Sequence, residues 1–279
     1  MGSSLARTPA IPIIVHGLVS HATLNPTGGV DGFEGNSQAL SLKFPFRSEI
    51  PLEIWGSENL EILDLEGNLF TGKLPSGFVG LRNLRVLNLG FNRLHRGFPF
   101  LCKMCCFRAS EFSCNKFNVS IPSFVGSFFK LRGLYLANNK LNGTVPAVLG
   151  SKCQYFQHLD LSGNSLLGGI PYTLGNCRRL RMLLLFSNKL NGEIPRELGQ
   201  LGSLEVLDIS RNFINGMIPS ELGHCAELSV LVLSSLFEMW PNDKNKNRKV
   251  SVSLPTVANH EYNHFQGSIP TEITALPKL

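Results

Sequence analysis

One motif recurs along most of this chain, and it limits the possible folds more than any other feature. Its copies are 23 to 25 residues long, apart from a last copy of 51 residues, and each approximates LxxLxLxxNxLxGxIPxxLGxLxx, whose positions we number as places 1 to 24. A degenerate copy, "LSLKFPFRSEIPLEIW", precedes the first repeat. A single copy cannot bury its own apolar residues, so the pattern predicts an array in which neighbours share one core. The repeats begin at Leu60, Leu84, Phe107, Leu131, Phe156, Leu180, Leu204 and Leu228.

The places within a repeat predict its local structure. Leucines at places 1, 4 and 6 bracket a short strand and point into the shared core, so the stacked strands should form a ladder on the order of 40 Å long. We expect strands near residues 62–65, 86–89, 133–136, 158–161, 182–185, 206–209 and 230–233. Place 9 is asparagine, which we expect to hydrogen-bond the backbone of the neighbouring turn. These asparagines are Asn68, Asn92, Asn115, Asn139, Asn164, Asn188, Asn212 and Asn263.

The second half of the pattern carries a resemblance to a known family. "LNGEIPRELG", at residues 190–199, resembles the plant-specific class of leucine-rich repeat, and this resemblance covers residues 40–279. Longer strings, such as "LEILDLEGNLFTGKLP" and "LRNLRVLNLGFNRL", resemble the ectodomains of plant receptor-like serine/threonine protein kinases of the receptor-like protein kinase two, or Toadstool, group. The resemblance implies an α/β repeat fold, a leucine-rich-repeat solenoid with a curved parallel β-sheet on its concave face. It also implies a non-catalytic extracellular module at the plasma membrane that binds a peptide or a co-receptor in developmental signalling.

The chain departs from that family in several respects. It has no apolar run long enough for a membrane span, no kinase motif and no N-terminal cysteine pair, and Leu279 is place 1 of a further repeat. We therefore expect a partial ectodomain, which on its own is secreted or mislocalised. Its repeat domain should cover residues 40–279, after a disordered segment at 1–39. A secreted leucine-rich-repeat defence or inhibitor protein without a kinase is the alternative function.

The last repeat is interrupted. Leu228, Leu231 and Leu233 fill places 1, 4 and 6, but Asn263 reaches place 9 only after 27 additional residues. A loop of this length is usually functional or disordered. The resemblance implies an island at residues 234–262 that takes part in ligand binding, whereas "NDKNKNRK" at 242–249 has the composition of a mobile loop. Both interpretations stay open.

Two motifs suggest metal chemistry, and neither fits its context. "HEYNH", from His260 to His264, matches the zinc-protease pattern, which needs both histidines on one helical face. Asn263 and Gly267 already belong to the repeat, so we expect no catalytic zinc and no cofactor, and a zinc peptidase is the least favoured function. Cysteines at 102, 105, 106 and 114 lack the paired spacing of a zinc site, which indicates a degraded repeat instead.

The remaining cysteines, the sequons and the charge bear on compartment and partners. Cys177 and Cys225 stand at place 22, where other repeats have leucine, so we expect them to be buried, and a disulfide between Cys153 and Cys177 is possible at stacking distance. Sequons make Asn118 and Asn142 candidate glycosylation sites. The net charge of +6 is scattered, apart from residues 242–249, so it does not predict a nucleic-acid partner.

The outward face of the strands is the expected ligand-binding surface. Side chains alternate along a strand, so places 3, 5, 7 and 8 should point out of the concave sheet. Met182, Leu184 and Phe186 then form an exposed apolar row, a feature that often marks a contact. The alternative is a patch covered by the island. The candidate ligand-binding residues are His158, Asp160, Met182, Leu184, Phe186, Asp208, Arg211, Val230 and Val232.

Overall fold

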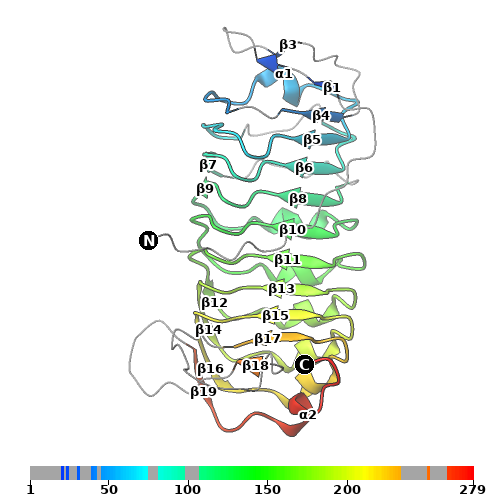
Figure 1. Ribbon diagram of the computed structural model, residues 1–279, viewed down its shortest axis with the longest axis vertical. Helices are drawn as coiled ribbons and strands as arrows, with labels where there is room; N and C mark the ends of the chain where they lie inside the picture. The colour runs from blue at the N-terminus through cyan, green and yellow to red at the C-terminus, as the bar shows by residue number, and fades with distance from the viewer. Residues whose placement is uncertain are drawn as a thin grey trace, which may run out of the picture.

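The repeats lie in one stack that runs along the long axis of the molecule (Figure 1). The computed structural model describes residues 20–21, 23–24, 30–31, 39–42, 45–74, 81–97, 107–233, 250–251 and 263–279. Most of the segment expected to be disordered, at 1–39, and most of the expected island, at 234–262, lie outside the described residues.

A parallel sheet of 11 strands forms one side of the stack, and the repeats from Leu60 to Leu228 contribute one strand each, at places 3 to 5. All the strands expected from the leucine pattern are present, and the Phe107 repeat supplies β8 in the same register. The strand order is β1-β4-β5-β6-β8-β10-β11-β13-β15-β17-β18. The strands are β1 (Ser20–His21), β4 (Ala39–Ser41), β5 (Ile62–Asp64), β6 (Val86–Asn88), β8 (Ala109–Glu111), β10 (Gly133–Tyr135), β11 (His158–Asp160), β13 (Met182–Leu184), β15 (Val206–Asp208), β17 (Val230–Val232) and β18 (Val250–Ser251).

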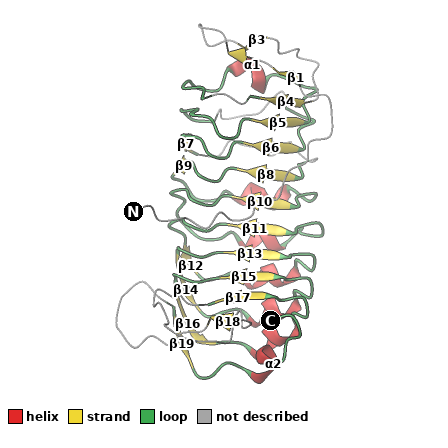
Figure 2. Cartoon of the chain, viewed as in Figure 1, coloured by secondary structure: helices red, strands yellow, loops and turns green. Residues whose placement is uncertain are grey.

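Further strands form a second column beside the main sheet (Figure 2). Four of them make a parallel sheet in the order β12-β14-β16-β19, and β7 pairs with β9 in parallel fashion. The second column lies at places 10 to 14, after the asparagine. Its strands are β7 (His95–Arg96), β9 (Lys116–Phe117), β12 (Leu167–Gly168), β14 (Lys189–Gly192), β16 (Phe213–Met217) and β19 (His264–Gln266). Before the repeats, and outside this column, β2 (Thr23–Leu24) pairs with β3 (Val30–Asp31) in antiparallel fashion.

A short helix lies in each turn for which the structure describes the residues after the proline. Each follows the Ile-Pro or Val-Pro pair, whose extended proline begins the helix without needing a backbone donor. They are the 3₁₀ helices η1 (Ser123–Ser127), η2 (Ala147–Gly150), η3 (Tyr172–Asn176), η4 (Arg196–Gln200) and η5 (Ser220–His224), and the single-turn α-helices α1 (Leu52–Trp55) and α2 (Thr271–Thr274).

The asparagines at place 9 join the turns of neighbouring repeats. Asn212 is typical, with 1% of its surface exposed. Its Nδ2 donates to the carbonyl oxygens of Leu185, Ile209 and Ser210, each at 3.0 Å, and its Oδ1 accepts from the backbone N–H of Leu190 at 3.0 Å. One side chain thus satisfies four backbone groups in two repeats, which removes the cost of burying turns without partners.

A disulfide joins two neighbouring repeats. It links Cys153 to Cys177, whose Cα atoms are 5.1 Å apart. Cys177 is therefore bonded rather than a free apolar residue, while Cys225 is free and buried as expected. A cross-link that closes a 24-residue loop stabilises a fold by about 3 kcal/mol in the chain-entropy model.

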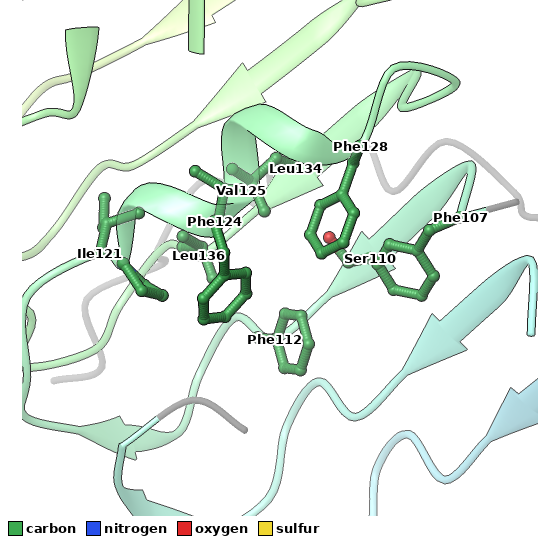
Figure 3. A pocket seen from close by; sticks show the side chains of 10 residues that line it. Phe107, Ser110, Phe112, Ile121, Phe124, Val125, Phe128, Leu134 and Leu136 are labelled. Carbon is green, nitrogen blue, oxygen red and sulfur yellow. The ribbon is translucent and has the colours of Figure 1, made fainter. Parts of the chain in front are cut away.

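The Phe107 repeat has a defect in its core. Its place 4 is Ser110, where the other repeats have leucine, and the Ser110 hydroxyl lies among the rings of Phe107, Phe112 and Phe128 (Figure 3). These residues line an apolar cavity of about 20 Å³. Ser110 is 1% exposed, and its hydroxyl has no hydrogen-bond partner in the described part of the chain. The missing leucine therefore leaves both a void and an unpaired polar group.

Replacing Ser110 by alanine should stabilise the stack by about 1 kcal/mol, because an unpaired buried hydroxyl costs on the order of 1 to 3 kcal/mol. Urea unfolding followed by far-ultraviolet circular dichroism measures the difference. Ser113→Ala is the matched control, since the Ser113 hydroxyl accepts from the backbone N–H of Ala137 at 3.1 Å and its loss should destabilise the stack. A destabilising Ser110→Ala substitution would show that the hydroxyl has a partner, such as a water in the cavity.

Candidate functional site on the strand face

The outward surface of the main sheet, which we call the strand face, carries one continuous apolar row. Register pairs Met182 with Val206, and Val206 with Val230, so the place-3 side chains of three repeats stand side by side. All three are half-buried, and His158 stands next in the row beside Met182. Val206 was missing from the expected site residues, although it occupies the same place as Met182 and Val230. It closes the gap between them and makes the row contiguous.

Two residues expected at an exposed site are buried instead. Leu184 and Asp160 are each 4% exposed, so the predicted exposed row of Met182, Leu184 and Phe186 is wrong at its middle position. Register places Leu184 directly between Asp160 and Asp208, where neighbouring strands about 4.8 Å apart cover it from both sides. Phe186 and Met182 keep part of their surface exposed.

The carboxylates at place 5 have a structural role. Asp160 Oδ1 accepts from the backbone N–H of Ser162 at 3.0 Å and from its hydroxyl at 2.6 Å, and Asp208 makes the same pair of bonds to Ser210. Each acid therefore holds the turn that follows its strand. Burial raises the pKa of both carboxyls above the usual range, while the bonds from the serines lower it. The interpretation of Asp160 as a charged rim for a ligand is replaced by this turn-capping role.

Arg211 lies in the turn after β15 rather than on a strand. Its φ is +52°, and place 8 takes a positive φ in seven repeats whether or not it is glycine. Simple alternation therefore does not set the direction of this side chain. The Arg211 charge also lowers the pKa of the Asp208 carboxyl, against the larger raising effect of burial. Val232 is half-buried at place 5, next to Asp208.

A second polar cluster lies on the strand face toward the N-terminal end. The Tyr135 ring covers Gly133, since Tyr135 Cε2 lies 2.6 Å from the point that a Cβ at Gly133 would occupy. The ring centroids of Tyr135 and His158 are 6.2 Å apart. Beside Tyr135 in the register lies Glu111, whose pKa is raised to about 7 by burial, partly offset by bonds from Ser113. None of the patterns in the sequence pointed to Glu111.

Glu111→Gln should make the stability of the protein less dependent on pH. The folded state holds a proton on Glu111 up to about pH 7, whereas the unfolded chain releases it near 4.5. The folded state therefore binds more protons in this window, so the free energy of unfolding falls as the pH rises from about 4.5 to 7. Glutamine keeps the acceptor for the Ser113 N–H and carries no charge, so the variant should be more stable than the wild type at pH 8, by about 1 to 3 kcal/mol.

Urea unfolding at pH 5 and pH 8 provides the measurement. Glu58→Gln, at an exposed position before the Leu60 repeat, is the control and should leave the pH dependence unchanged. Equal pH dependence in the wild type and Glu111→Gln would show that this carboxyl titrates in the same way in both states.

The motifs that suggested chemistry are only partly described. His264 begins β19, so this half of "HEYNH" lies in a strand, and His260 is outside the described residues. Cys102, Cys105 and Cys106 are also outside, while Cys114 is free. In the described segments, no three His, Cys, Asp or Glu side chains gather as a metal site, and no helix is long and apolar enough to cross a membrane.

The two sequon asparagines lie on neighbouring repeats, both at place 12 and both exposed. Asn142 Nδ2 donates to the backbone oxygen of Asn118 at 3.1 Å. Glycosylation of Asn118 and Asn142 stays a prediction, and these positions belong to the second column of strands rather than to the strand face.

Two models of known protein families match parts of the repeat array. A family model described as "Leucine Rich Repeat" matches residues 130–151, 155–177, 179–201 and 203–225, and one described as "Leucine rich repeat" matches residues 55–94. The chain is a leucine-rich-repeat solenoid. The solenoid is homologous to plant leucine-rich-repeat receptor-like proteins and receptor kinases. "Receptor-like protein 7" from Arabidopsis thaliana is 31% identical to this chain, over 56% of this chain and 16% of the relative. "Brassinosteroid LRR receptor kinase" from Solanum lycopersicum is 37% identical, over 52% of this chain and 14% of the relative.

Solved ectodomains have the same fold. The plant membrane receptor kinase GASSHO1/SCHENGEN3 from Arabidopsis thaliana, in complex with CASPARIAN STRIP INTEGRITY FACTOR 2, superposes with a TM-score of 0.70 at 31% identity, over 83% of this chain and 24% of that one. The Arabidopsis receptor kinase HAESA, in complex with the peptide hormone IDA and the co-receptor SERK1, superposes with a TM-score of 0.63 at 30% identity. That match covers 69% of this chain and 32% of the HAESA chain. The chain spans between 9% and 16% of the first curated relatives it matches.

Proposed function

We propose that the strand face recognises an extended peptide segment or a co-receptor, as the ectodomain part of a plant receptor-like kinase. The half-buried row of Met182, Val206 and Val230 carries this proposal, since a contiguous apolar surface often marks a contact. Phe186 adds an aromatic side chain to it, and the exposed Arg211 in the turn after β15 adds a charge at its border, a combination that suits an interface. The solved relative bound to a peptide hormone and a co-receptor supports the choice of ligand class.

The extracellular side of the plasma membrane is the proposed location. A disulfide between repeats persists in an oxidising compartment, and Cys153–Cys177 is such a bond. The exposed Asn118 and Asn142 sequons fit the same secretory route.

Finer assignments belong to the same proposal. We place residues 40–279 in one repeat domain, with an island at 234–262 that is inserted into the Leu228 repeat after its strand. The strings that resemble the Toadstool group favour a role in developmental signalling.

Selection from a library of random extended peptides, displayed on phage, tests the proposal. Binders enriched on the wild-type protein should lose binding to Phe186→Glu and to Val206→Glu, since each substitution puts a carboxylate into the apolar row. The SERK1 ectodomain is the probe for co-receptor binding, with the same two variants. Deletion of residues 237–260 should weaken the binding of the same peptides if the island contributes.

Met217→Glu is the matched control, because Met217 is 70% exposed on the second column of strands. It should leave peptide binding unchanged. Failure to enrich any peptide and to bind SERK1, or equal binding to the wild type and both strand-face variants, would exclude this surface as the recognition site.

A further inference from the structure

Basic side chains are concentrated in one part of the chain. Residues 67–192 contain sixteen lysines and arginines but only two acidic residues, Glu111 and Asp160, whereas the rest of the chain has ten basic and eighteen acidic residues. The first reading of the sequence, that the positive charge is scattered, is therefore wrong. Glu111 and Asp160 lie on the strand face, so neither neutralises the edges of this part of the solenoid.

One edge of the main sheet gathers a continuous set of these cations. The residue at place 2 stands just before each strand, and backbone bonds join successive ones. Arg108 N donates to Arg85 O at 2.8 Å, and Arg132 N donates to Arg108 O at 2.6 Å. The three arginines thus stack on three consecutive repeats, and all are exposed. Like charges on directly opposite positions destabilise a sheet, so folding does not explain this arrangement.

Among the described residues, ion pairs neutralise this ladder at its two ends only. Arg85 pairs with Glu61 at 3.1 Å, and Arg181 Nε donates to Glu205 Oε1 at 2.9 Å. Between these ends lie Arg108, Lys130, Arg132, Lys152 and Arg179, which we call the basic edge. Within the described segments, none of these five forms an ion pair.

Two exposed aromatic rings stand among the cations of the basic edge. Phe129 is 40% exposed, with Lys130 Nζ 5.7 Å from its ring centroid, and Tyr155 is 44% exposed, with Arg179 Cζ 5.7 Å from its centroid. The Cys153–Cys177 disulfide joins the two turns that carry Tyr155 and Arg179, and so fixes them relative to each other. The basic edge is therefore a surface held in place by a disulfide, and it presents both positive charge and flat apolar rings.

We propose that the basic edge binds a linear acidic polysaccharide, a chain of uronate sugars lying across consecutive repeats. Each guanidinium pairs with a planar carboxylate, and the apolar C–H face of a sugar ring packs on Phe129 or Tyr155. Single-stranded nucleic acids also bind surfaces that combine cations with aromatic rings. The disulfide and the exposed sequons favour an extracellular ligand instead. The basic edge and the apolar row lie on different repeats, so this proposal does not depend on peptide recognition.

Titration of the whole protein with a galacturonate oligomer at low salt tests the proposal. Arg108→Gln/Arg132→Gln should weaken binding about tenfold, because two exposed charge contacts together contribute on the order of 1.4 kcal/mol. Arg93→Gln/Lys140→Gln removes the same charge from the second column of strands and should change affinity less than twofold. Tyr155→Ala should weaken binding, whereas Tyr172→Ala, which removes a ring that is 66% exposed on η3, should not.

Three further probes identify the ligand class. The fully methyl-esterified oligomer keeps the sugar rings but loses the carboxylates, so it should bind far more weakly. Polyglutamate and a single-stranded DNA oligonucleotide carry negative charge without a uronate ring, and they should also bind more weakly. The proposal is overturned if the wild type does not bind the oligomer, if both double variants lose affinity equally, or if either alternative polyanion binds as tightly.

Discussion

Gly199→Ala should destabilise the solenoid by more than about 4 kcal/mol, the range reached only by severe core defects. A Cβ at Gly199 would lie 2.2 Å from the carbonyl oxygen of Glu221 in the next repeat. The obstructing atom belongs to the backbone of η5, so it cannot move aside as a flexible side chain can. Neighbouring helices would have to separate, and this would open the leucine core between the two repeats.

The loss is measured by urea unfolding followed by far-ultraviolet circular dichroism. Gly202→Ala is the matched control, since a Cβ at Gly202 meets no atom within 4 Å and the residue does not need a positive φ. That substitution should change the free energy of unfolding by less than about 1 kcal/mol. Similar midpoints for the two variants would show that the helices do not pack as closely as described.

Asn212→Ala should have the second largest effect, a loss of about 3 kcal/mol. The substitution leaves the N–H of Leu190 and the carbonyl oxygens of Leu185, Ile209 and Ser210 without this partner. Each buried group left unpaired costs on the order of 1 to 3 kcal/mol, although water reaching the cavity recovers part of this.

Asn191→Ala is the control for this effect, because Asn191 is exposed at place 12 and does not belong to the buried ladder. Native-state hydrogen exchange adds a second measurement. The Leu190 amide should exchange faster in Asn212→Ala than in the wild type, while amides in β10 should keep their protection. Unchanged exchange at Leu190 would contradict the role of Asn212 as its acceptor.

The proposed ligand surfaces lie on different parts of the solenoid, and this makes their tests independent. The apolar row lies on the Leu180, Leu204 and Leu228 repeats, whereas the basic edge lies on the Phe107, Leu131 and Phe156 repeats. A receptor-like protein with both could hold a polysaccharide and a protein ligand at once. Loss of one activity in Arg108→Gln/Arg132→Gln and of the other in Phe186→Glu would separate the two functions.

The sequence by itself determined the periodic features of this protein. Leucines at places 1, 4 and 6 were sufficient to predict the strands from β5 to β17, since their spacing fixes which residues face the core and repeats every 24 residues or so. The same period gave the class of fold and the resemblance to plant receptors. These properties are local to a repeat, so the residues of a single repeat are enough to predict them.

Only the tertiary structure decided what depends on neighbouring repeats. Leu184 reads as exposed in its own strand, yet it is buried because Asp160 and Asp208 stand on either side of it. The Cys153–Cys177 bond and the alignment of Arg85, Arg108 and Arg132 likewise join residues about one repeat apart. Burial, cross-links and charged ladders depend on contacts between repeats. The pattern within one repeat does not show which side chains of the neighbouring repeats lie beside it.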